Sequence, residues 1–199
     1  RDKLQVLGIE IPLSEDLSVL TDEVPLGRLT AWNRLVVHPM EGFDSLPDGA
    51  PSPLSFRRYH RFASGGAALI WFEATAVLRE ARSNPGQLWL HEGNVKAFER
   101  IVRETKRAGI DATGHEPIMV MQLTHSGRYS KPEGIPQPII AQRSGVLDPT
   151  HSLPDDYPVV TDDYLNRLQD TYVDAARLAA QAGFDGIDIK ACHGYLIAE

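Results

Sequence analysis

Four short runs of apolar residues recur along the chain, at residues 35–40, 67–72, 117–123 and 184–189. Each is continuous rather than alternating, which is typical of parallel strands that are buried on both faces. Asp185 and Asp188 interrupt the last run, and each needs a partner if it is buried. The pattern predicts four buried strands in which Phe184, Ile187 and Ile189 belong to the core.

Segments with helical features lie between these runs. Ser52 followed by Pro53 is typical of an N-cap and a first-turn proline. Thr161, with two aspartates directly after it, is typical of another helix start. The expected helices cover 53–64, 93–108 and the segment after Thr161, and they end at Gly65, Gly109 and Gly183.

Two long stretches lack a clear period. Residues 1–27 mix apolar residues with acids and prolines, which favours a leading arm or a short hairpin. Residues 129–160 are rich in proline, and a loop of this length usually carries function or forms a lid. The rest of the chain alternates strand and helix, which indicates a parallel α/β protein.

Every predicted strand is followed by polar residues. The last one leads into Lys190, His193 and Tyr195, side chains that can donate hydrogen bonds or carry a proton. Neither G-x-G-x-x-G after the first strand nor G-x-x-x-x-G-K-[ST] occurs, so the usual phosphate loops of open sheets are absent. Polar residues at all four strand ends favour a TIM (β/α)8 barrel over a doubly wound sheet.

Composition narrows the classes of partner. The net charge is −7, and the 20 Lys and Arg residues are scattered, which argues against nucleic acid. We find no membrane span or signal peptide, and the single cysteine suits a reducing compartment, so we expect a cytoplasmic protein. The 199 residues are fewer than the roughly 250 that a complete barrel typically needs.

The strand ends carry specific motifs. In order they are Asn33-Arg34-Leu35-Val36-Val37-His38-Pro39-Met40, Phe72-Glu73-Ala74-Thr75-Ala76-Val77, Gln122-Leu123-Thr124-His125-Ser126-Gly127-Arg128, and Gly183-Phe184-Asp185-Gly186 through His193-Gly194-Tyr195-Leu196. Together they resemble the successive strand ends of the old yellow enzyme family, FMN-dependent ene-reductases on a (β/α)8 barrel. The resemblance covers residues 28–199 and implies about the first half of the barrel, ending after the fourth strand.

The resemblance implies a cofactor site for FMN, with NADH or NADPH as reductant. The implied flavin contacts are Pro39, Met40, Glu41, Ala74 and Gln122. The family usually has Thr or Cys where this chain has Glu41, so this carboxylate either turns away or lowers the flavin reduction potential.

The resemblance also implies a catalytic set formed by Lys190, His193 and Tyr195. Tyr195 matches the proton donor to the α-carbon of an unsaturated small-molecule substrate. The family has His-x-x-Asn or His-x-x-His where this chain has Lys190-x-x-His193, two donors that polarise the substrate carbonyl. The ammonium group of Lys190 suggests a more anionic activating group, and the alternative is that it merely extends to solvent.

Some interpretations stay open. His125 and Arg128 either line the flavin edge or hold their loop, and Cys192 is expected to be a small buried filler. No His-Glu-x-x-His pair indicates a metal, and we expect none. Alternatives to the ene-reductase are a barrel amine dehydrogenase with an iron–sulfur cluster, or a non-catalytic half-barrel that binds or assembles. A homo-oligomer is possible in each case.

Overall fold

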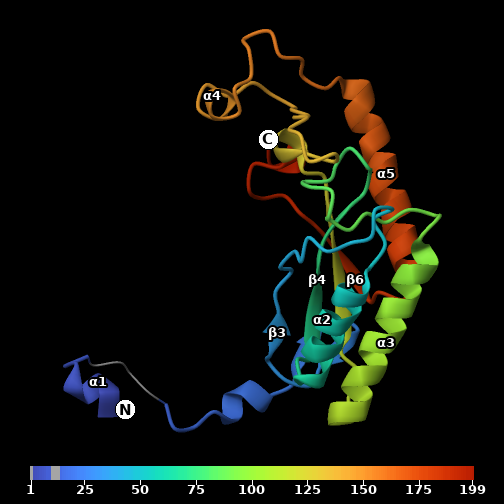
Figure 1. Ribbon diagram of the computed structural model, residues 1–199. Helices are drawn as coiled ribbons and strands as arrows, with labels where there is room; N and C mark the ends of the chain where they lie inside the picture. Colours follow the sequence, from blue (N-terminus) through green and yellow to red (C-terminus); the bar gives the residue numbers. More distant parts are fainter. Residues whose placement is uncertain (1, 10–13) are drawn as a thin grey trace.

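The computed structural model describes residues 2–9 and 14–199. Its main feature is a parallel sheet of four strands in the order β3-β4-β5-β6. The strands are β3 (Val36–Val37), β4 (Leu69–Ala76), β5 (Ile118–Thr124) and β6 (Gly186–Ile189). Helices α2, α3 and α5 connect them and lie along the sheet (Figure 1). The predicted alternation of strand and helix is confirmed.

Local capping signals place two helices correctly. Helix α2 (Pro53–Ser64) begins at Ser52, whose side chain accepts from the backbone N–H groups of Leu54 and Ser55, and it ends at Gly65. Helix α5 (Asp162–Gln181) begins at Thr161, whose hydroxyl accepts from the N–H of Tyr164. In both helices a hydroxyl satisfies N–H groups that would otherwise lack a partner.

The predicted end of the helix expected over residues 93–108 is wrong. Helix α3 (Val95–Thr113) continues past Gly109 and ends at Gly114, which has a φ of 80°. A Cβ atom at Gly109 would lie 2.6 Å from Cδ of Pro117, so this glycine allows close packing against the start of β5. The left-handed residue that closes the helix is therefore the later glycine.

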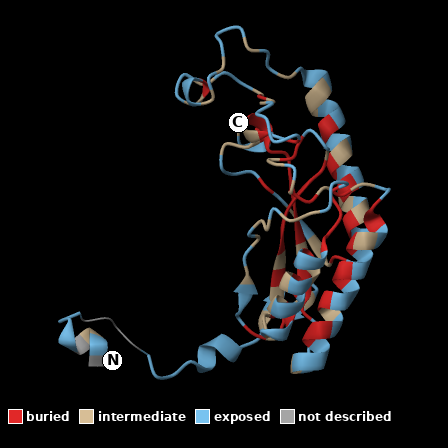
Figure 2. Ribbon diagram, in the orientation of Figure 1, coloured by how far each residue is buried: buried red, intermediate tan, exposed pale blue. Residues whose placement is uncertain are grey.

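The core lies between the sheet and the helices, where buried residues gather (Figure 2). The ring of Phe72 stacks on Tyr59 of α2 at 4.2 Å between centroids and meets Phe184 edge-on at 5.1 Å. Offset and edge-to-face aromatic pairs of this kind stabilise a core beyond the area that they bury. The predicted burial of Phe184 is confirmed.

The predicted burial of the two outer strands is wrong. Val36 of β3 is 45% exposed, and Ile187 and Ile189 of β6 are 40% and 48% exposed. Both strands lie at an edge of the sheet and pair on one side only within the described residues. Their apolar side chains therefore lack the neighbours that cover β4 and β5.

Asp185, just before β6, and Asp188, within it, are half-buried and both have hydrogen-bond partners. Asp185 accepts from Lys106 Nζ at 3.0 Å and from the N–H of Met119 at 2.8 Å. Asp188 accepts from Gln122 Nε2 at 2.7 Å. These contacts tie β6 to α3 and β5, so the two acids help to position the last strand.

The N-terminal region contains short elements. They are α1 (Asp2–Val6), the 3-10 turn η1 (Ser18–Thr21), and an antiparallel hairpin of β1 (Val24–Leu26) and β2 (Leu29–Ala31). Ala31 packs with Ala68 and Ile118 in a second, smaller core cluster. A hairpin is therefore present, but it spans residues 24–31 and so crosses the end of the region predicted as a leading arm or hairpin. Residues 1 and 10–13 of that region lie outside the described residues, and the domain boundary after residue 27 stays a prediction.

The long segment after β5 follows an irregular path, as predicted. It begins with η2 (Gly127–Tyr129) and includes only the short helix α4 (Leu147–Thr150). A last turn, η3 (Leu196–Ala198), lies beside it (Figure 1). No helix in the described part of the chain is both long and apolar enough to cross a bilayer.

Candidate active site

The carboxyl ends of the four parallel strands lie at one edge of the sheet, and the loops that follow them contact one another. Lys190, after β6, forms an ion pair with Glu41, after β3. The N–H of Val77, after β4, donates to the carbonyl of Thr124 at 3.1 Å. The N–H of Leu196 donates to the carbonyl of His125 at 3.2 Å. The loops thus form one connected layer above the sheet.

Lys190 is held within this layer. Its N–H donates to the carbonyl of Leu123 at 2.9 Å, which extends the β5–β6 ladder by one residue. The ammonium nitrogen lies 3.6 Å from Oε1 of Glu41 and 4.5 Å from the ring centroid of Tyr195. Since Lys190 is only 8% exposed, it does not extend to solvent. Its charge is instead shared between a carboxylate and an aromatic face.

Tyr195 is a half-buried phenol beside Lys190. Its ring lies 5.6 Å from the ring of Tyr129 and 6.3 Å from that of His193, between centroids. Burial, together with the nearby carboxylate of Glu41, raises the pKa of Tyr195 to about 12. The group is therefore a neutral phenol at physiological pH, which is the form that can deliver a proton.

His193 lies in a strained turn. It has a φ of 59°, and Gly194 follows with a φ of 63°. A left-handed conformation is uncommon for a residue with a Cβ atom, and such strain concentrates at functional sites. The exposed Cys192 contacts the ring, with Sγ 3.4 Å from Nδ1, so the expectation that this cysteine is buried is wrong.

Glu41 turns inward, toward Lys190. Its second carboxylate oxygen accepts from Ser83 Oγ at 3.3 Å, and its side chain is 9% exposed. Burial raises the pKa of Glu41, while the ammonium group of Lys190 opposes the rise. The carboxylate thus connects the loops that follow β3, β4 and β6.

The other predicted cofactor residues occupy different environments. Gln122 is 8% exposed and donates to Asp188, and Ala74 is fully buried with its carbonyl accepting from Gln87 Nε2 at 3.1 Å. Pro39 is half-buried, whereas Met40 is 75% exposed on the loop after β3. The structure therefore brings Glu41 and Tyr195 together through Lys190. The remaining cofactor residues lie within β4 and β5 or directly after β3.

Sequence reasoning missed a second buried charge cluster under the β3 loop. Glu73 is 1% exposed and accepts from Arg58 Nη2 at 2.6 Å, from Tyr59 OH at 3.1 Å and from the N–H of Gly42 at 2.8 Å. A Cβ atom at Gly42 would overlap the guanidinium group of Arg58. The signal was a lone carboxylate in an apolar strand, which requires a cationic partner. This cluster fixes the backbone next to Glu41.

Gly127 allows two strand ends to approach each other. It has a φ of 57°, and a Cβ atom there would lie 2.5 Å from the backbone nitrogen of Leu196. Only glycine adopts this conformation without steric cost while leaving room for the neighbouring backbone. The approach sets the position of the segment that carries Tyr195.

His125 holds its loop through both ring nitrogens. Nδ1 accepts from the N–H of Gly127 at 3.0 Å, so Nε2 carries the proton and donates to Tyr164 OH at 2.8 Å. Tyr164 in turn donates to Glu80 at 2.7 Å. Of the two roles left open for His125, these contacts support the structural one.

We expect acid to destabilise the protein through His125. Burial lowers the pKa of this imidazole to about 4, from an ordinary value of 6.5. Between pH 6.5 and pH 4, His125 therefore takes up a proton in the unfolded chain but not in the folded protein. The free energy of unfolding is then highest above about pH 6.5 and falls as the pH approaches 4. The loss is on the order of 3 kcal/mol.

Urea unfolding at several pH values measures this loss. His125→Gln should flatten the profile over that interval, and His60→Gln on the exposed surface of α2 is the matched control. An unchanged profile in His125→Gln would show that other groups cause the acid sensitivity.

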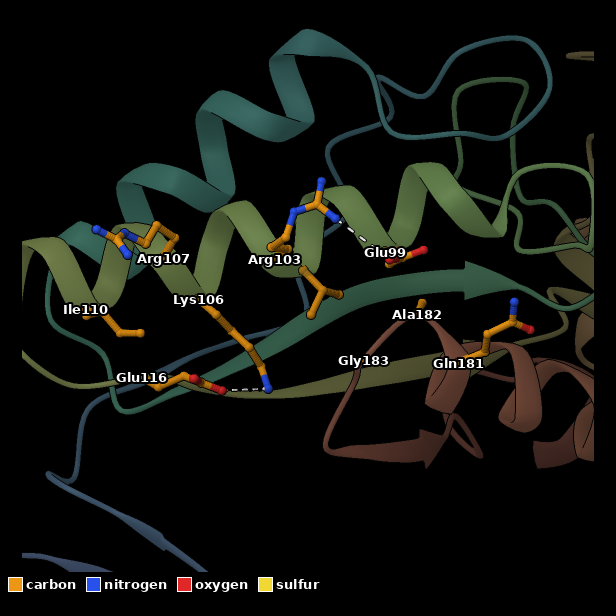
Figure 3. Close-up of a pocket in the computed structure, with 10 residues that line it drawn as sticks. Glu99, Arg103, Lys106, Arg107, Ile110, Glu116, Gln181, Ala182 and Gly183 are labelled. Carbon is orange, nitrogen blue, oxygen red and sulfur yellow. Dashed lines mark ion pairs between the residues drawn. The ribbon is translucent and has the colours of Figure 1, made fainter.

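A separate groove of about 510 Å³ lies between α3 and the end of α5, on the outer side of the sheet (Figure 3). Arg103, Lys106 and Arg107 line it. Each of these cations already has a carboxylate within 3.7 Å; the partners are Glu99, Glu116 with Asp185, and Asp111 respectively. The charges are balanced, and we do not assign a ligand to this groove.

Comparison with known proteins identifies relatives over most of the chain. Residues 23–199 match the model of the NADH:flavin oxidoreductase / NADH oxidase family. The chain is 33% identical over 174 residues to an NADPH dehydrogenase of Bacillus pumilus, covering 86% of this chain and 47% of the relative. It is 32% identical over 183 residues to an NADPH dehydrogenase of Listeria monocytogenes, covering 91% and 50%. The chain thus spans about half the length of the curated relatives that it matches.

Solved structures agree with this relationship. An old yellow enzyme homologue from Zymomonas mobilis is 29% identical, with a TM-score of 0.70 over 89% of this chain and 49% of that one. The old yellow enzyme from Trypanosoma cruzi, at 23% identity, shares the fold with a TM-score of 0.71 over 90% and 52%. Both neighbours are TIM-barrel proteins, which supports the predicted fold class. With the family model matching residues 23–199, the chain belongs to the NADH:flavin oxidoreductase / NADH oxidase family, the old yellow enzyme family that its strand-end motifs indicate.

Proposed function

We propose that this chain supplies the flavin- and substrate-binding strand ends of an FMN-dependent ene-reductase. The reaction transfers hydride from NADH or NADPH, by way of FMN, to an activated C=C bond of a small molecule. The observation that carries the proposal is the convergence of Glu41, which follows β3, with Lys190 and Tyr195, which follow β6 at the opposite edge of the sheet: Lys190 contacts both other residues.

The same proposal treats residues 28–199 as the first half of a (β/α)8 barrel. Two features support it besides the coverage of the relatives. Strands β3 and β6 each have an edge that is unpaired within the described residues. An apolar groove of about 560 Å³ also lies between α5 and β6, lined by residues such as Leu168, Tyr172 and Ile189. Further strands and helices would cover both.

The residues near the carboxyl ends of the central strands fit FMN. Gln122 and Thr124 lie two positions apart on β5 and face the same side of the sheet. Oγ1 of Thr124 is buried and has no hydrogen-bond partner among the residues described, so it is available to a ligand. Ala74, on the neighbouring strand β4, adds little bulk. Bound FMN would supply a two-electron carrier that takes hydride from a nicotinamide and gives it to carbon.

Two residues of the chain would then act on the substrate. His193, held in a strained and exposed turn, would donate to the carbonyl oxygen on which negative charge develops. Tyr195, a neutral phenol at physiological pH, would give its proton to the α-carbon.

Uptake of FMN tests the proposal. We expect the purified protein, incubated with FMN and desalted, to retain the absorbance of oxidised flavin and to bleach when NADPH or NADH is added without oxygen. Gln122→Leu should weaken FMN retention about tenfold, because a well-placed hydrogen bond contributes roughly that much. The matched control is Gln169→Leu on α5. Colourless wild-type protein after incubation would favour the non-catalytic module.

A further inference from the structure

Two residues that depart from the family pattern are in contact. Glu41 replaces the usual Thr or Cys, and Lys190 replaces the first histidine of the substrate pair. They lie far apart in the sequence, yet their charged atoms are 3.6 Å apart and their side chains are 9% and 8% exposed. A buried charge is stable only with a partner, so each replacement supplies the partner that the other requires.

Both oxygens of Glu41 are engaged. Oε1 faces Lys190, and Oε2 accepts from Ser83. The other buried carboxylate near this loop, Glu73, is already occupied by Arg58, Tyr59 and Gly42. The charge of Lys190 is therefore balanced by Glu41, and its ammonium group remains beneath the ring of Tyr195.

We propose that Glu41 is a specificity-determining residue, which neutralises Lys190 beneath Tyr195 so that the site selects an uncharged activating carbonyl over a carboxylate. This inference rests on the function proposed above and names its substrate class. An unpaired lysine would attract an anion, whereas the pair carries no net charge and places a carboxylate close to the binding position. Burial raises the pKa of Glu41, which is consistent with a carboxylate that depends on its cationic partner.

A double-mutant cycle tests the pairing without any cofactor. Glu41→Gln and Lys190→Met should each lower the urea midpoint, and the double variant should recover much of the summed loss, because neither charge is then left alone. The exposed pair Arg79 and Glu133, changed to Met and Gln, is the control and should give additive effects. Additive losses at Glu41 and Lys190 would overturn the proposal.

Ligand binding tests the specificity. Benzoate and benzamide share ring and shape but differ in charge. In the FMN-loaded protein, isothermal titration should show that Glu41→Gln tightens benzoate binding about tenfold or more while benzamide binding is unchanged. Equal effects on both ligands, or none, would overturn the proposal. Failure of the wild-type protein to take up FMN would instead reject the proposed function, and the cycle would still report on the pairing.

Discussion

Tyr195→Phe should slow the oxidation of the reduced flavin by a cyclic enone about 10²- to 10⁴-fold, the range that a general acid contributes. Reduction of the same flavin by NADPH should proceed at the wild-type rate, because that step needs no proton from the phenol. Anaerobic stopped-flow absorbance separates the two steps.

The substitution removes the proton while leaving the surroundings of the ring in place. Burial and Glu41 raise the pKa of Tyr195 to about 12, so the proton is present throughout the physiological range. The ring of Tyr195 contacts the ammonium group of Lys190 and the ring of Tyr129. Phenylalanine keeps the ring and its packing but removes the proton, so a loss of rate reports on the chemistry rather than on the fold.

Tyr129→Phe is the matched control, because the ring of Tyr129 lies 5.6 Å from that of Tyr195. Loss of the Tyr129 hydroxyl should leave the oxidation rate within a few-fold of wild type. A Tyr195→Phe protein that oxidises at the wild-type rate would remove Tyr195 from the proton-donor role. Equal slowing of both steps would indicate a disturbed flavin site instead.

The sequence predicted the elements whose signals are local. Ser52 and Thr161 mark helix starts because a hydroxyl next to the first turn satisfies nearby N–H groups, whatever the rest of the fold does. The helix end predicted at Gly109 was wrong because a glycine can either end a helix or allow close packing. Only the position of Pro117 in space distinguishes the two roles.

Burial of the outer strands depends on their neighbours in space. The apolar residues of β3 and β6 match those of β4 and β5 in type, but their exposure depends on whether another strand or helix covers them. Hydrophobicity alone records the preference of a side chain and not its surroundings.

The motifs predicted which residues form the candidate site, but not which of those residues contact one another. The strand-end motifs indicated Lys190, His193 and Tyr195, and parallel strands bring such ends to one edge. That Glu41 would pair with Lys190 could not be inferred, since nothing local links residues that follow the first and last strands of the sheet. The two departures from the family pattern are explained together once that contact is known.

Arg128 connects the loop after β5 to the long proline-rich segment and to Glu199. Its side chain is completely buried. Nε donates to Glu199 at 2.8 Å, Nη2 donates to the carbonyl of Gln142 at 3.0 Å, and Nη1 donates to Asp148. The planar guanidinium group is suited to three partners in different directions, which a lysine cannot reproduce. Of the two roles left open for Arg128, these contacts support holding the loop.

Arg128→Met should lower the free energy of unfolding by about 3–5 kcal/mol, the usual cost of removing one partner from a buried ion pair. Asp148 keeps Arg143 as a partner at 2.6 Å, but Glu199 loses the cation that neutralises it. Urea unfolding measures the loss. Arg128→Lys should restore part of it by returning the charge. Arg177→Met, which removes an exposed pair with Asp174, is the control and should cost about 1 kcal/mol or less.

Hydrogen exchange locates the effect within the fold. The N–H of Ala141 donates to the second oxygen of Glu199 at 2.7 Å, so its protection depends on the position that Arg128 imposes on that carboxylate. In Arg128→Met this amide should exchange faster, by more than the global loss of stability explains, while the amides of β5 should follow the global change. A variant with wild-type stability and unchanged exchange at Ala141 would mean that the carboxylates hold the loops without their cation. Because Leu196 lies in the segment between Tyr195 and Glu199 and donates to His125, loosening this end of the chain should also slow the oxidation step that depends on Tyr195.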